Sequence, residues 1–293
     1  MDRFLFLTID GLASGAVYAV FALSLVLIWR AARIVNFAQG AISVAAAYVA
    51  WSVGTHVGGW WLGLALAPLV GAALGVGLQR TALRRLGPDR HLEAMIVALG
   101  VVMVVQAVLG MVYGLQYEPM ATPVSDDVLV VGGVSTTSPY RLLVVAVAAS
   151  LVVAVALLFA RTRLGLRLRA AATAAEIARL SGISVARMTT IAWGLATGLA
   201  AFAAMLVLPT GLGLTPTAMD GVFITAFTAT VLGGLDSPLG AVLGGLAVGL
   251  VLDYATGYAS DPNLAPLAVL GLLLAVLLVR PRGIFSPGPA RRV

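Results

Sequence analysis

Nine long apolar runs constrain the fold of this chain more than any other feature of its sequence. Most approach the ~20 residues that a helix needs to cross the hydrocarbon layer of a membrane. Charged residues make up 10% of the 293 residues and hydrophobic residues 61%, whereas a soluble domain is about 25% charged. We therefore expect an all-α, polytopic, single transmembrane domain over residues 1–293. The runs are Ile9–Trp29, Ile34–Val53, Trp60–Leu78, Ala94–Tyr113, Leu142–Phe159, Ile191–Leu208, Gly221–Leu235, Gly240–Leu252 and Leu264–Val279.

The arginines predict the orientation of these runs. All eighteen basic residues are arginines, and sixteen of them lie on alternate connections and in the C-terminal tail. Only Arg3 and Arg141 lie on the opposite side, together with most of the acidic residues. Because connections rich in basic residues stay in the cytoplasm, we predict that the N-terminus is outside and the C-terminus inside. The cytoplasmic connections are then residues 30–33, 79–93 and 160–190.

The number of spans is eight or nine. The seventh and eighth runs, on either side of Asp236-Ser237-Pro238, are short and are read as discontinuous half-helices, or as one re-entrant pair. The segment GLASG at residues 11–15 also resembles GLATG at residues 194–198, in a run of opposite direction. Inverted repeats of this kind are common in transporters, although five small residues in Gly-rich runs also match by chance.

The predicted outer connection covers residues 114–140. Its sequence VLVVGGVST at residues 128–136 places β-forming residues on both sides of two glycines. This pattern favours a small β-hairpin, and the alternative is an unstructured loop. In either form, the connection offers a docking surface on the outer side.

The composition excludes several kinds of chemistry. With no cysteine and no lysine, the chain has neither a thiolate metal site nor the phosphate-binding loop GxxxxGK[ST]. His56 and His91 lie in opposite connections, so we expect no metal site, no cofactor and no catalytic residue. The basic residues flank membrane runs, which positive-inside bias explains better than binding of nucleic acid.

The longest arginine-rich connection, Arg161 to Arg187, is too long and too polar for a simple turn. Its alanines predict a helix over Ala170–Leu180, and Gly182 fits just beyond the helix end, where left-handed geometry is needed. This helix either docks into a groove of a cytoplasmic partner or lies on anionic lipid headgroups. Both interpretations stay open.

Four segments of the sequence resemble branched-chain amino-acid permeases of the LivH type. Glu176, followed six residues later by Gly182, is similar to the EAAxxxG coupling loop of ABC-importer permeases. The segment NFAQG at residues 36–40 is similar to the family's NFAHG. LGGLDSPLGAVLGG at residues 232–245 and RPRG at residues 280–283 are similar to its GGxGSxxGAxxGG and RPxGLFG stretches. Gln39 replaces the usual histidine and Asp236 the usual glycine, which puts the substrate in doubt.

The resemblance implies a non-enzymatic permease subunit of an ATP-driven importer in the bacterial inner membrane. It implies a second, homologous permease as heterodimer partner, two cytoplasmic ABC ATPase subunits that hydrolyse ATP, and an extracytoplasmic solute-binding protein. The ATPase contact is expected at the connection that spans residues 160–190. The residues expected to couple the subunits are Arg169, Glu176, Arg179, Gly182 and Arg187.

Four polar residues are candidates for the substrate pathway: Asn36, Gln39, Gln106 and Thr225. Asn36 and Gln39 begin the second run, where an N-terminal helix end attracts anionic groups; they equally suit an ordinary helix cap. Gln106 lies deep in the fourth run and must find a partner, more readily another span than the substrate. Thr225 either lines the passage or bonds its own helix.

Other functions remain open. Because no acidic residue lies in the middle of an apolar run, an ion-coupled carrier is disfavoured. A membrane scaffold without transport is another alternative. The same machinery for an amide, urea or a sugar is the nearest one.

Overall fold

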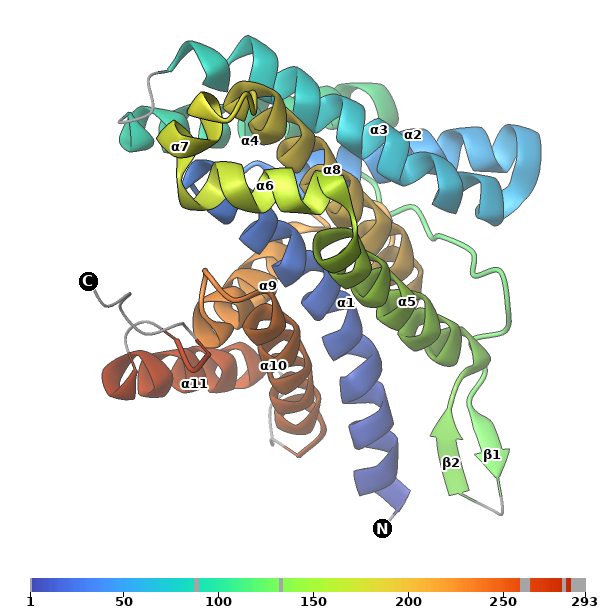
Figure 1. The fold of residues 1–293 in the computed structure, drawn as a ribbon. Helices are drawn as coiled ribbons and strands as arrows, with labels where there is room; N and C mark the ends of the chain where they lie inside the picture. Colours follow the sequence, from blue (N-terminus) through green and yellow to red (C-terminus); the bar gives the residue numbers. More distant parts are fainter. Residues whose placement is uncertain (1, 87–89, 132–133, 259–263, 281–282, 286–293) are drawn as a thin grey trace. The chain divides into compact units, whose positions relative to one another are not determined.

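The computed structural model describes residues 2–86, 90–131, 134–258, 264–280 and 283–285, and this part of the chain is almost entirely helical (Figure 1). Short π and 3₁₀ turns, η1 (Gly54–Gly58), η2 (Leu83–Arg85) and η3 (Leu208–Thr210), interrupt the α-helices. The helices are α1 (Asp2–Ala32), α2 (Gln39–Val53), α3 (Gly59–Thr81), α4 (His91–Tyr113), α5 (Pro139–Arg161), α6 (Arg163–Thr173), α7 (Ala175–Leu180), α8 (Val185–Val207), α9 (Asp220–Gly233), α10 (Pro238–Tyr258) and α11 (Ala265–Val279).

Within the described residues, six helical stretches are long and apolar enough to cross a membrane. One of them, Gln39–Arg85, has 47 residues, or roughly 70 Å if straight, about twice the ~30 Å hydrocarbon layer. It folds back at η1, so that α2 and α3 pack against each other. The shorter apolar helices are α9 and α11. The prediction of an all-α polytopic membrane protein is confirmed.

Each of the nine apolar runs corresponds to one described helix, but the eighth run was expected to be short and is not. Helix α10 has 21 residues and continues past Asp253, where the apolar run ends. A carboxylate does not stop a helix, and Asp253 lies beside polar partners that are described below. The prediction of a half-helix here is therefore wrong, whereas α9 is short, with 14 residues.

The chain divides into two compact units. The first unit comprises residues 1–26, 122–149 and 224–293, and the second comprises residues 27–121 and 150–223. Helices α1, α5 and α9 each contribute to both.

The second unit is built around the pair α3 and α8. A Cβ atom added to Gly71 or Gly75 of α3 would collide with Thr197 or Ala201 of α8, so the two backbones lie as close as glycine permits. Close approach of this kind increases the dispersion contacts between helices in lipid, where water provides no hydrophobic driving force. Helix α2 packs against both members of the pair.

The first unit has a comparable glycine-based pair. Gly11 and Gly15 of α1 face Leu246 and Leu250 of α10, and Gly249 of α10 in turn lies against Gly15. The two matching sequence segments, GLASG and GLATG, thus each occupy a close helix contact within their own unit. Helix α11 packs against α10.

The connection between α4 and α5 contains two antiparallel strands, β1 (Leu129–Val131) and β2 (Val134–Thr137). They coincide with the segment whose sequence favours a hairpin. Its two central glycines, residues 132 and 133, lie outside the described residues. The backbone N–H of Tyr140 donates a hydrogen bond to the carbonyl of Ser125 (3.3 Å), which closes the connection at the start of α5.

Candidate coupling surface and pathway residues

Helix α6 is amphipathic and packs by one face on the second unit. The backbone N–H of Gly165 donates to the hydroxyl of Thr162 (3.0 Å), which caps the first turn. Arg167 and Arg169 of the same helix are exposed. The apolar face joins a cluster at the ends of α1, α5 and α8 that includes Ala31, Leu158, Phe159, Leu164, Leu168, Ala171, Met188 and Ala192.

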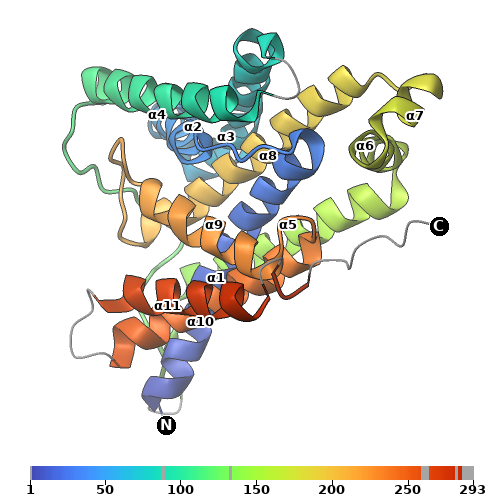
Figure 2. The ribbon, with the colours of Figure 1, turned by 90° about the vertical axis from the view of Figure 1, so that its left-hand side faces the viewer.

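The single helix expected over Ala170–Leu180 is in fact two helices. Helix α6 ends at Thr173, and α7 begins at Ala175. Between them Ala174 has φ −146° and ψ 77°, which is outside the helical region. Alanine propensity favours a helix locally, but it does not prevent a bend where α6 stays packed on its cluster and the chain turns toward α8. Figure 2 shows α6 and α7 as separate segments beside the start of α8.

The end of α7 agrees with the geometry expected at Gly182. This glycine has φ +77°, and its N–H donates to the carbonyl of Arg179 (3.0 Å). The next N–H, that of Ile183, donates to the carbonyl of Ala178 (2.9 Å). These two bonds form a Schellman motif, which requires a left-handed residue after the helix. Ile183 then joins the apolar cluster under α6.

The five residues expected to contact the ATPase are all exposed. They are Arg169, Glu176, Arg179, Gly182 and Arg187. On α7, Ile177 is 67% exposed and Leu180 is 90% exposed. The connection thus exposes apolar side chains, charges of both signs and the turn at Gly182.

Asn36 and Gln39 are buried and hydrogen-bonded to each other. The Asn36 amide donates to Oε1 of Gln39 (2.7 Å), and Nε2 of Gln39 donates to the carbonyl of Ala196 on α8 (3.1 Å). An ordinary N-cap was one of the two interpretations of Asn36, but the cap position of α2 is Ala38, whose N–H donates to the Asn36 side chain (3.1 Å). The pair therefore ties the start of α2 to the middle of α8.

Gln106 finds a partner on another helix, as a deeply placed amide requires. Its Nε2 donates to both carboxylate oxygens of Asp220 at the start of α9, at 3.1 and 3.0 Å. Both side chains are half-buried. Thr225, further along α9, is half-buried as well.

A charged cluster in the first unit escaped the sequence reasoning. Arg141 of α5 forms an ion pair with Asp10 of α1, and their side chains are 26% and 16% exposed. Asp253 of α10 accepts a hydrogen bond from Ser14 and interacts electrostatically with Arg141. The signal was present in the sequence: Arg141 is an isolated arginine beside an apolar run, and such a charge needs acidic partners.

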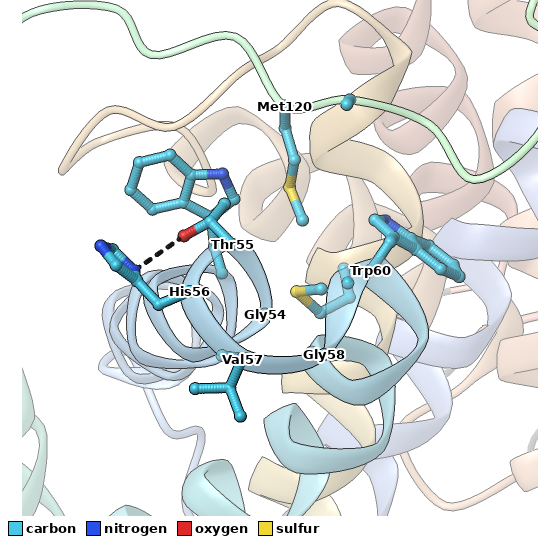
Figure 3. Close-up of a pocket in the computed structure, with 13 residues that line it drawn as sticks. Gly54, Thr55, His56, Val57, Gly58, Trp60 and Met120 are labelled. Carbon is cyan, nitrogen blue, oxygen red and sulfur yellow. Dashed lines mark hydrogen bonds between the residues drawn. The ribbon is translucent and has the colours of Figure 1, made fainter.

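A hollow of about 470 Å³ lies at the η1 turn (Figure 3). Trp60 of α3 lines it, and Met120 enters it from the connection that follows α4. His56 Nδ1 lies 3.1 Å from the hydroxyl of Thr55. The volume falls within the range of small-molecule sites. The sequence offered only a Gly-rich turn flanked by tryptophans as a clue.

Two segments that carry the sequence resemblance meet in the first unit. The N–H of Ile284 donates to the carbonyl of Leu232 (2.9 Å), and that of Phe285 to the carbonyl of Gly233 (3.2 Å). Gly233 lies directly against Gly240 of α10, with no room for a Cβ atom. The glycines of residues 232–245 thus allow a tight turn between α9 and α10. The chain after α11 packs against this turn.

Comparison with known proteins agrees with these features. Residues 7–278 match the family described as branched-chain amino acid transport system / permease component. The high-affinity branched-chain amino acid transport system permease protein BraD of Pseudomonas aeruginosa is 28% identical, over 97% of this chain and 96% of its own length. The corresponding permease protein LivH of Escherichia coli K12 is 27% identical over the same shares. The chain belongs to the family of permease components of branched-chain amino acid transport systems.

Proposed function

We propose that this chain is the membrane-spanning permease subunit of an ATP-driven importer for branched-chain or chemically related amino acids. The observation that carries this proposal is the family match over residues 7–278. The relatives BraD and LivH, which belong to branched-chain amino acid transport systems, suggest the substrate class. The substitutions at Gln39 and Asp236 leave the choice among related small polar solutes to experiment.

The orientation we propose has the N-terminus outside and the C-terminus inside the bacterial inner membrane. The distribution of the arginines supports it, because sixteen of eighteen lie on the same predicted side. Residues 160–190 then face the cytoplasm. The connection with strands β1 and β2 faces the binding protein.

The contact with an ABC ATPase subunit is assigned to the α6–α7 connection. Glu176 and Arg179 offer charges to a partner, Arg169 and Arg187 flank them, and the exposed Leu180 offers an apolar anchor. An interface core of apolar residues within a polar rim is typical of protein–protein contacts. Gly182 keeps α7 at a fixed angle to α8, so that a push on α7 is passed to the membrane helix.

The complete machine would contain a second, homologous permease, two ATPase subunits and an extracytoplasmic binding protein. Transport would proceed by alternating access: ATP closure of the ATPases opens the membrane helices outward to accept substrate from the docked binding protein, and relaxation opens the inner side. Asn36 and Gln39 at the α2–α8 contact, Gln106 with Asp220, and Thr225 are assigned to the pathway. In this reading residues 1–293 act as one permease domain.

Uptake by vesicles tests the proposal. The chain is reconstituted with its partner subunits, and leucine uptake is measured with and without ATP, then with an ionophore. The proposal predicts uptake that requires ATP and survives the ionophore. Uptake that persists without ATP and collapses with the ion gradient would identify an ion-coupled carrier. Selective uptake of urea, an amide or a sugar instead would keep the machine and overturn the substrate.

A further inference from the structure

An apolar groove of about 420 Å³ lies in the second unit where α3, α5 and α8 meet. Gly194 and Gly198 of α8 and Ala72 of α3 form part of its wall. A Cβ atom at Gly194 or Gly198 would meet α3, so these glycines let α8 lie close to α3 along the groove. Its rim includes Val155 and Phe159 of α5 and Phe202 of α8.

The length of the groove corresponds to one leaflet of a bilayer. Its lining residues on α8 run from Ile191 to Phe202, a rise of roughly 16 Å at 1.5 Å per residue. Half of the ~30 Å hydrocarbon layer is about 15 Å. An acyl chain that follows α8 would therefore fill the groove from the headgroup level to the middle of the membrane.

One end of the groove carries two arginines. Leu27 and Phe159 line both the groove and a second hollow of about 20 Å³, enough for roughly one water-sized group. Arg30 of α1 and Arg169 of α6 also line this second hollow. Arg30 is half-buried and Arg169 is exposed. Guanidinium groups suit phosphate because they present several N–H donors in a fixed plane.

We propose that the groove and its two arginines bind one anionic phospholipid. The acyl chain lies along α8 between α3 and α5, and Arg30 and Arg169 hold the phosphate group. The two arginines complement the charge of a phosphate group and the groove has the length of an acyl chain, and together these features favour a lipid over an apolar helix of a partner subunit. The proposal holds for either orientation of the chain. It shares Arg169 with the proposed ATPase contact, but its test measures lipid binding and does not depend on transport.

Native mass spectrometry of the delipidated full chain tests the headgroup part. Phosphatidylglycerol is titrated against the wild type and against the variant Arg30→Gln/Arg169→Gln. We expect roughly 30-fold weaker binding in the variant, because each of the two arginines contributes attraction to an anionic lipid. Arg84→Gln/Arg85→Gln removes the same charge from exposed positions outside both hollows and should bind like the wild type. Equal affinity of both variants would overturn the proposal.

Further arms separate the lipid from other occupants. Val155→Trp fills the groove and should abolish binding of phosphatidylglycerol, whereas Val153→Trp, 55% exposed on the same helix and outside the groove, should not. If Val155→Trp does not fold, Arg169→Gln alone changes only an exposed side chain and must still weaken binding.

If inorganic phosphate displaced the lipid, the two arginines would form a site for free phosphate, and the proposal of a lipid site would be overturned. If Val155→Trp still bound the lipid but no longer co-purified with a second permease, the groove would be a subunit interface. That result would refute the proposal.

Discussion

Nε2 of Gln39 donates a hydrogen bond to the carbonyl oxygen of Ala196, 3.1 Å away and 157 residues further along the chain. The same side chain accepts a bond from Asn36 through Oε1. Both amides are almost completely buried. This bond links the first turn of α2 to the middle of α8, between the two helices that pack on α3.

Replacing Gln39 by leucine should destabilise the protein. The change leaves the buried Asn36 amide and one lone pair of Ala196 without their partner, which costs about 1–3 kcal/mol. Thermal unfolding of the purified protein in detergent should show a lower Tm. Gln116→Leu, at an exposed position of the outer connection, is the control. Equal Tm values for the two variants would show that the Gln39 network contributes nothing to stability.

Glycine at position 75 should be necessary for the pairing of α3 with α8. A Cβ atom there would overlap Thr197, whereas one on Gly77, two residues further along α3, meets nothing within 4 Å. We expect Gly75→Leu to give little monodisperse protein in size-exclusion chromatography and Gly77→Leu to behave like the wild type. The prediction fails if the two variants elute alike.

The ion pair between Arg141 and Asp10 should behave as a unit. Arg141→Gln alone leaves partly buried carboxylates without their counter-charge, which should destabilise the protein by less than the ~3–5 kcal/mol found for a fully buried pair. Asp10→Asn/Arg141→Gln removes both charges and should recover a large part of this loss, measured as thermal stability in a double-mutant cycle. Arg84→Gln, at an exposed position, controls for the loss of an arginine. Additive effects of the two single substitutions would mean that the two residues do not interact.

Because Gly182 has a positive φ, we expect the effect of a substitution there on coupled uptake to depend on whether the new residue tolerates that φ. Asparagine tolerates a positive φ, whereas a β-branched residue is strained there. Gly182→Val should therefore lower uptake while ATP hydrolysis by the partner subunits continues, and Gly182→Asn should remain close to the wild type. Membrane insertion should be the same for both. Normal coupled uptake by Gly182→Val would remove Gly182 from the coupling surface.

Much of the fold could be predicted because lipid imposes strict rules on a sequence. Apolar runs mark the membrane helices. The end of α7 could be predicted from Gly182 alone, because the left-handed conformation that follows a helix end favours glycine. The split of α6 from α7 could not be predicted, since both sides of Ala174 have the same helix-favouring alanines. The length of α10 was misjudged because hydropathy ends at Asp253 but hydrogen bonding of the helix does not.

The candidate site was predictable only where sequence neighbours make the contacts. Asn36 and Gln39 are three residues apart, and their bond follows from local geometry. By contrast, Gln106 with Asp220, and Arg141 with Asp10, are contacts between distant helices, which one sequence does not reveal. The lipid groove depends on three helices meeting, and its glycines resemble any other packing glycines in the sequence.

The side of the membrane on which the α6–α7 connection lies tests the central claim most directly. The natural chain has no cysteine, so Glu176→Cys and Thr55→Cys each introduce a single thiol at an exposed position. A membrane-impermeant maleimide is applied to intact cells and to inverted vesicles. We predict that the thiol at position 176 is labelled only in inverted vesicles and that at position 55 only in intact cells. Labelling of position 176 in intact cells would place the coupling surface outside, out of reach of any ATPase, and would contradict this account.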